Sequence, residues 1–185
     1  MDEALWALGR GTGVVALVLL TLAVVLGVFT RSGRTLLGLP RFSVTLVHRD
    51  TAILASVFTL IHVATLFFDP FAQISLLDVV VPFRGSYAPF WLGLGTLGVD
   101  LLIAVLVTAL FRRWIGVRVF RFVHWFVYAM WPVAFLHGIG MGSDRTQGWF
   151  VLVAVLCVLA VAGAVAWRLT RGFVELRRVR TGEAP

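Results

Sequence analysis

Five long apolar runs constrain the fold of this 185-residue chain more than any other feature of its sequence. They lie at about residues 11–29, 43–68, 89–111, 116–140 and 148–167. A helix needs about 20 apolar residues to cross the roughly 30 Å hydrocarbon core of a bilayer. Because 60% of the residues are hydrophobic and only 14% are charged, little of the chain remains for a soluble domain. We therefore expect an all-α integral membrane bundle of about five transmembrane helices over residues 1–170, and then a short basic cytoplasmic tail, residues 171–185.

The basic residues predict how such a bundle is oriented. All 16 of them are arginine, and most flank one side of the predicted spans: Arg31, Arg34, Arg41, Arg112, Arg113, Arg118, Arg121, Arg168, Arg171, Arg177, Arg178 and Arg180. The other side has only Arg10, Arg84 and Arg145. The positive-inside rule then places the N-terminus outside and the C-terminus in the cytoplasm. The net charge of +7 is interpreted as a topology signal that can also contact anionic lipids, and not as a nucleic-acid surface.

The N-terminal residues and the single cysteine exclude several kinds of segment and metal site. The first residues, MDEALWALGRG, are acidic at the start and lack a basic region, so the first apolar run is expected to be a retained span and not a cleaved signal peptide. Cys157 is the only cysteine. A disulfide, an iron–sulfur cluster or a Cys-x-x-Cys-His haem attachment within the chain is therefore excluded. Cys157 is expected to be a small buried apolar residue.

The four histidines of the chain fall into two pairs, each inside an apolar run. His48 and His62 are 14 residues apart, and His124 and His137 are 13 apart, so the members of each pair lie about 20 Å apart along a helix. Ionisable residues at membrane depth are costly and usually functional. A step of 14 residues is only about 40° short of four turns, so His48 and His62 face nearly the same way, whereas a step of 13 is about 140° short. A kink at the intervening Pro132 is expected to reorient His137.

Matching by depth couples the histidines across two spans. The second and fourth spans are predicted to run in the same direction, which places His48 beside His124 at the inner side and His62 beside His137 at the outer side. Each couple can supply two axial imidazoles to a haem iron between two helices. Zinc and copper sites normally need further ligands, and none has suitable spacing. The alternative is that the histidines make helix-packing hydrogen bonds or form a proton relay.

Residues around the histidines have candidate roles and plainer alternatives. Ala55, midway between the first two, leaves space between two bound groups, and Trp131 is a candidate inter-haem aromatic or simply core. Asp100 is a candidate to orient a histidine ligand or carry protons, or it pairs with a nearby hydroxyl or arginine. The arginines at the inner end are candidate partners of haem propionates but are equally explained by topology: Arg41, Arg49 and Arg121.

The glycines and the longest loop each have a structural and a functional interpretation. The motif Gly93-Leu-Gly95-Thr-Leu-Gly98 is formally G-x-G-x-x-G, but no strand is predicted before it, so helix packing explains it better than dinucleotide binding. The first span carries Gly9, Gly11, Gly13 and Gly27, for which packing is again the preferred explanation. The loop 69–89 is either a connector or a cap over the outer site, with Arg84 available to an anionic acceptor.

The histidine pattern resembles a known family. The spacing H-x13-H on one span and H-x12-H two spans later is similar to the ferric reductase-like transmembrane domain, whose superfamily includes NADPH oxidases, ferric reductases and the haem-binding subunit of the bacterial periplasmic methionine sulfoxide reductase. The stretches LWALGRGTGVVALVLL and VHRDTAILASVFTLIH resemble small actinobacterial members. The resemblance covers about residues 5–170 and implies two b-type haems in a multi-pass protein of the bacterial plasma membrane. Many members have six spans, whereas five are expected here.

The resemblance also shapes the expected function. We expect an oxidoreductase component that moves electrons from a cytoplasmic or membrane-pool donor to a ferric chelate, oxygen or a periplasmic redox partner. No flavin or NAD(P) site is expected in this chain, so a separate flavin reductase or a quinol would be the donor. Two alternatives remain: a small proton-coupled transporter or channel, or a structural haem-bearing subunit of a larger complex. A proton relay has no need for depth-matched pairs on parallel spans.

Overall fold

The fold is an all-helical bundle in the computed structural model, which describes residues 2–32, 38, 40–70, 72 and 74–170. The helices are α1 (Asp2–Ser32), α2 (Arg41–Phe68), α3 (Leu76–Val80), α4 (Pro89–Leu110), α5 (Arg112–Ile115), α6 (Val117–His124), α7 (Val127–Met141) and α8 (Gly148–Leu169). Within the described residues, five stretches are long and apolar enough to cross a membrane: Glu3–Ser32, Arg41–Phe68, Pro89–Leu110, Val117–Met141 and Gly148–Leu169. The predicted fold class and the five spans are thereby confirmed. Arg34 and the basic tail, 171–185, lie outside the described residues.

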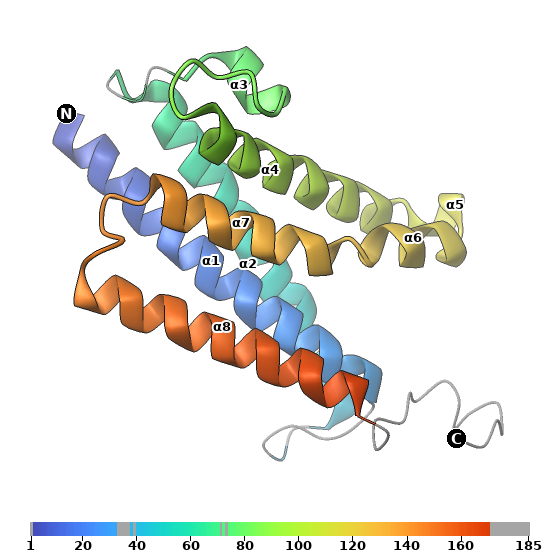
Figure 1. Ribbon diagram of the computed structural model, residues 1–185. Coiled ribbons are helices and arrows are strands. Elements are labelled where there is room, and N and C mark those ends of the chain that lie inside the picture. Colours follow the sequence, from blue (N-terminus) through green and yellow to red (C-terminus); the bar gives the residue numbers. More distant parts are fainter. Residues whose placement is uncertain (1, 33–37, 39, 71, 73, 171–185) are drawn as a thin grey trace, which may run out of the picture.

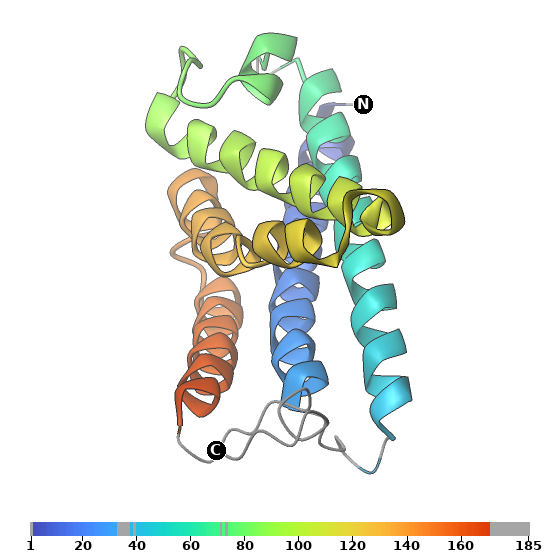
Figure 2. The ribbon, with the colours of Figure 1, turned by 90° about the vertical axis from the view of Figure 1, so that its right-hand side faces the viewer.

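Helix α1 is the centre of the bundle. It packs along α2 and also contacts α7 and α8, and Figure 2 shows it between α2 and α8. Its spanning segment is the most buried of the five, and Val28 on it is fully buried. The buried hydroxyls of Thr12 and Thr21 donate to carbonyls of the preceding turn, so their protons are satisfied within α1. The arrangement leaves α1 free to present small residues to the helices around it.

The loop between α2 and α4 folds back onto the first turns of α4. Its short helix α3 begins with a capping box, in which Ser75 Oγ accepts from the Asp78 N–H and the Asp78 carboxylate accepts from the Ser75 N–H. The Ser75 hydroxyl also donates to the Asp78 carboxylate at 2.7 Å, and this bond, together with the one from the Ser75 N–H, lowers the pKa of the Asp78 carboxyl. Thr96 of α4 donates to the Asp78 carbonyl at 2.6 Å, and Gly93 lies against the Phe83 backbone. The segment is therefore attached to α4 (Figure 1).

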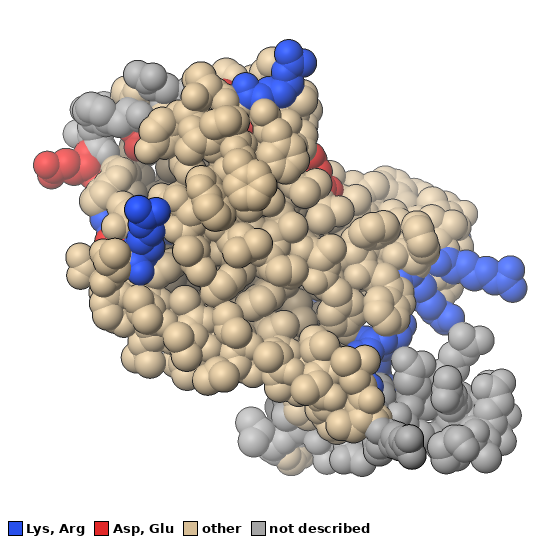
Figure 3. All heavy atoms as spheres, viewed as in Figure 1, with Lys and Arg blue, Asp and Glu red and all other residues tan. Residues whose placement is uncertain are grey.

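Charged side chains are concentrated at the two ends of the bundle. At one end, Arg10 of α1 forms an ion pair with Asp144, which lies between α7 and α8, and its guanidinium lies 3.9 Å from the Trp6 ring centre. At the other end, arginines of α5 and α6 project from the surface (Figure 3). Between the two ends the visible face is almost wholly uncharged. This distribution fits a bundle whose middle lies in a bilayer.

Candidate cofactor site

Four imidazoles face one another in two couples between α2 and the α6–α7 segment. The ring centres of His48 and His124 are 6.3 Å apart and the planes cross at 84°. The ring centres of His62 and His137 are 6.4 Å apart and the planes cross at 77°. This is the arrangement that matching by depth predicts. At these separations the rings are too far apart to hydrogen-bond directly, so each couple leaves a gap between its two imidazoles.

Three of the imidazoles are fixed by the same kind of hydrogen bond to a neighbouring helix. His62 Nδ1 lies 2.7 Å from the Gly9 carbonyl, and His48 Nδ1 lies 2.9 Å from the Ala23 carbonyl, both on α1. His137 Nδ1 lies 2.8 Å from the Trp91 carbonyl on α4. Because a carbonyl only accepts, each Nδ1 must carry the proton. That tautomer leaves Nε2 with a free lone pair, which is the form in which a neutral imidazole binds a metal.

A glycine follows each accepting carbonyl by four residues. A Cβ on Gly13 would lie 2.9 Å from the His62 ring, and one on Gly27 would lie 3.3 Å from the His48 ring. A Cβ on Gly95 would lie 2.5 Å from the His137 ring. In a helix, the side chain at i+4 lies next to the carbonyl of residue i. Glycine at position i+4 leaves room for an imidazole to hydrogen-bond to a carbonyl that also accepts a hydrogen bond within its own helix.

The helix packing expected of these glycines is contact with imidazoles of the neighbouring helices. Gly13 and Gly27 are 14 residues apart on α1, the same step as His62 and His48 on the antiparallel α2, so the two helices match at both depths. Gly95 is the central glycine of the G-x-G-x-x-G motif. Gly93 of the same motif lies against the Phe83 backbone. Only Gly98, whose nearest neighbour is Ala134 at 3.9 Å, is an ordinary helix contact of that motif. The equal spacing was the signal that could have identified the contacts on α1.

The helix that carries His124 and His137 is broken between them. The break lies at Trp125–Phe126, between α6 and α7, and α7 continues through Pro132. The distortion expected at the proline therefore occurs about two turns earlier. Proline has no N–H for the carbonyl of residue i−4 and its ring crowds that group, so the helix is weakened upstream of it.

Tight winding at the break helps to bring His137 round to His62. The N–H groups of Phe126, Tyr128 and Ala129 bond to carbonyls three residues earlier. Such bonds wind the chain by about 120° per residue instead of about 100°, which supplies part of the rotation that an ideal helix lacks. Arg168 of α8 holds this segment from the side, with its guanidinium 4.6 Å from the Trp125 ring centre and a hydrogen bond to the Tyr128 hydroxyl.

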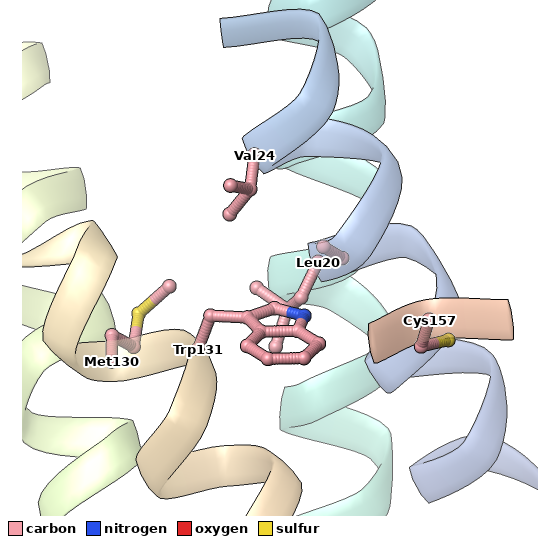
Figure 4. Packing of buried hydrophobic residues seen from close by; sticks show 6 residues of the cluster. Leu20, Val24, Met130, Trp131 and Cys157 are labelled. Carbon is pink, nitrogen blue, oxygen red and sulfur yellow. The ribbon is translucent and has the colours of Figure 1, made fainter. Parts of the chain in front are cut away.

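A buried apolar layer separates the two couples. Ala55 is fully buried, and Trp131 packs with it in a cluster that also contains Leu20, Val24, Met130 and Cys157 (Figure 4). The Trp131 indole N–H donates to Thr21 Oγ1 at 2.9 Å, and its ring stacks on Phe135. Trp131 is therefore fixed at the depth of Ala55, midway between the imidazole couples. Cys157 is buried in the same layer, as expected for a small apolar residue.

The other candidate residues make none of the imidazole hydrogen bonds described above. Arg41 and Arg121 are exposed near the inner couple's end of the bundle, and Arg49 is paired with Asp50 at 3.0 Å. Arg84 is exposed between α3 and α4. Asp100 lies on α4, and none of the imidazole hydrogen bonds described above involves it. The structure thus orients three of the four histidines through backbone carbonyls, a kind of partner that carries no sequence signature.

The donor set fits a metal held between two imidazoles. With a nitrogen–metal bond of about 2.0 Å on each side, the two ring centres would lie about 6.3 Å apart, as both couples do. Among the described residues, no group of three or more His, Cys, Asp or Glu side chains could hold a metal ion. A metal in either couple would therefore need its remaining ligands from a non-protein group. A haem, which supplies four equatorial nitrogens and needs two axial ligands, meets this requirement.

One family model matches the chain, over residues 12–135, and its description is ferric reductase like transmembrane component. The matched range includes three of the four histidines and ends two residues before His137. It begins at Thr12, so it takes in most of α1 and all of α2 and α4. No curated protein and no solved structure gives a significant match to the chain.

Proposed function

The chain belongs to the ferric reductase-like transmembrane family, and from this premise we propose that it is a di-haem membrane cytochrome b. Its role is electron transfer at a membrane. His48 and His124 would hold the inner haem, and His62 and His137 the outer one. The observation that carries the proposal is the geometry of the couples: two ring separations of 6.3 and 6.4 Å with three Nδ1 atoms bound to carbonyls.

The residues of the chain supply position, orientation and exclusion of water. A haem iron between two imidazoles accepts and releases one electron at a time, and this is the chemistry that the bound group would contribute. The anchored rings keep their orientation in both oxidation states because their carbonyl partners belong to helix backbone. The layer of Ala55 and Trp131 keeps the two sites apart and dry. The exposed arginines at the inner end are proposed partners of the propionates there.

The donor and the acceptor lie at opposite faces under this proposal. A flavin reductase in the cytoplasm or a quinol in the membrane would supply electrons to the inner side. A ferric chelate, oxygen or a periplasmic redox protein would receive them at the outer side, where Arg84 is available to an anion. The rival function, a proton relay, is less well supported because the Nδ1 atoms of three histidines are engaged by backbone carbonyls and the rings do not bond to one another.

The test of the proposal is the haem content of the purified protein. The preparation should be coloured, and the difference spectrum of dithionite-reduced minus oxidised protein should show b-type bands. Extraction as the pyridine adduct should give about two haems per chain, one for each imidazole couple. A folded, monodisperse preparation that stays free of haem after expression with added haem precursor would contradict the proposal and favour the relay.

A further inference from the structure

One of the four imidazoles is held differently from the other three. His48, His62 and His137 each have a carbonyl partner for Nδ1 and a glycine against the ring. The Nδ1 of His124 is buried and has no hydrogen-bond partner among the residues that the structure describes. No described glycine has His124 among the atoms nearest to its Cβ position. The neighbour of this ring is instead Phe120, with ring centres 5.2 Å apart.

The missing bond makes His124 a weaker ligand in two ways. A hydrogen bond from Nδ1–H to an acceptor raises the basicity of an imidazole and fixes its orientation, and His124 lacks both effects. In addition, an imidazole that binds through Nε2 keeps a proton on Nδ1. A buried N–H without an acceptor is unfavourable. This free-energy penalty is removed when the His124 ring turns away from the metal position and its N–H finds an acceptor. The outer couple has two anchored ligands, whereas the inner couple has only His48.

The backbone beside His124 is also irregular. His124 is the last residue of α6, and Trp125 and Phe126 after it form the break before α7. An open groove of about 480 Å³ is lined by residues of this break but not by His124 itself: Phe122, Trp125, Phe126, Tyr128 and Ala129. The lining is mostly aromatic, so the surroundings of the break favour small, uncharged, apolar molecules. Arg168 holds Trp125 and Tyr128, whereas no described residue is hydrogen-bonded to the His124 Nδ1.

On the basis of the proposed function, we infer that His124 is an exchangeable axial ligand and that the inner site binds a small neutral diatomic molecule. In the exchange, the bond from iron to His124 Nε2 breaks and a bond from iron to the incoming molecule forms. No electron or proton is transferred. His48 remains bound on the other side, held by the Ala23 carbonyl. The outer site, closed by two anchored imidazoles, excludes the same molecule.

Carbon monoxide is a suitable probe because it binds ferrous haem and carries no charge. The purified full-length protein, reduced with dithionite, would be titrated with carbon monoxide and followed by its absorption spectrum. We expect one carbon monoxide for about two haems, with half of the ferrous signal unchanged at saturation. Uptake by neither haem, or equal uptake by both, would overturn the inference while leaving the di-haem proposal intact. A protein without haem would overturn the proposed function itself.

Two double variants would assign the reactive site. H62A/H137A removes both outer ligands and leaves the inner couple, whereas H48A/H124A leaves only the outer couple. The first should bind one carbon monoxide at its single remaining haem, so that the whole ferrous signal changes, and the second should not bind it. The opposite result would place the exchangeable ligand at the outer site and refute the assignment to His124. If either variant fails to fold, the wild-type stoichiometry still decides whether one haem differs from the other.

Discussion

At the scale of residues, the site depends on positions that carry no chemistry of their own. Three glycines and three backbone carbonyls hold three imidazoles, through the same four-residue step from carbonyl to glycine. The four histidines could be recognised in the sequence because ionisable side chains are rare at membrane depth. Their carbonyl partners could not, because every residue has a carbonyl. Of the glycines in the first span, only Gly13 and Gly27 repeat the 14-residue step of the histidines, and the structure shows that these two contact imidazoles whereas Gly11 has nothing within 4 Å of its Cβ position.

A prediction at this scale concerns Gly95. In G95A the added methyl group would lie 2.5 Å from the His137 ring, so the ring must leave its place beside the Trp91 carbonyl. Overpacking of this kind costs about 1–3 kcal/mol, which weakens binding at one site by roughly 5- to 150-fold. We expect G95A to lose most of the outer haem and to keep the inner one, as measured by haem per chain and by the reduced spectrum.

Matched variants on α1 make the prediction sharper. G27A should weaken the inner haem only mildly, since its Cβ would lie 3.3 Å from the His48 ring, a distance that a small ring shift relieves. G11A adds a methyl group to open space and should keep wild-type haem content. Loss of haem in G11A equal to that in G95A would mean that helix propensity or folding, and not contact with an imidazole, explains the effect.

At the scale of elements, the geometry of the four imidazoles depends on the second and fourth spans. The number and order of the five spans followed from the apolar runs, because a bilayer demands about 20 apolar residues per helix, but the first helix, Asp2–Ser32, begins nine residues before its apolar run at 11–29. The coupling of histidines by depth followed from the parallel direction of two spans. The position of the break did not, since Pro132 is visible in the sequence but the disruption falls upstream at Trp125–Phe126. Sequence alone does not tell which turn of a weakened helix gives way.

The coupling of these helices gives a second prediction. H62A and H137A each remove one ligand of the outer couple, so both should lose mainly the outer haem and leave the same residual spectrum and midpoint potential. H48A should lose mainly the inner haem, and H124A should weaken the same haem but less severely, because His48 keeps its hydrogen bond to the Ala23 carbonyl. In each variant the haem of the other couple should remain, because that couple lies about 20 Å away along the helices. All four should abolish electron transfer across the membrane.

The comparison between partners is what tests the pairing. If H62A matched H124A instead of H137A, α2 and the α6–α7 segment would pair at other depths. If all four variants kept two haems, the histidines would not be ligands at all. A redox titration of each purified variant, followed at the reduced haem bands, separates these outcomes.

At the scale of the whole molecule, the arginines order the bundle relative to the membrane. Helix α1 ends, α2 begins, α6 begins and α8 ends at one side of the bundle, and the described arginines towards that side are Arg31, Arg41, Arg49, Arg112, Arg113, Arg118, Arg121 and Arg168. The opposite side has Arg10, which is paired with Asp144, and the exposed Arg84 and Arg145. An asymmetry of eight against three is strong enough for the positive-inside rule to apply. The arginine-rich side should therefore face the cytoplasm.

This orientation predicts the behaviour of reporter fusions, and it decides which haem is the inner one. A fluorescent protein that matures only in the cytoplasm should be active when fused after α8, and an alkaline phosphatase that folds only in the periplasm should be inactive there. The same two reporters fused in the α7–α8 connection, after Gly142, should give the opposite pair of results, which controls for expression. Phosphatase activity after α8 together with fluorescence after Gly142 would show that the bundle has the opposite orientation in the membrane. His48 and His124 would then lie at the outer face, so the exchangeable ligand would be exposed to the periplasmic side and the donor and acceptor sides would exchange places.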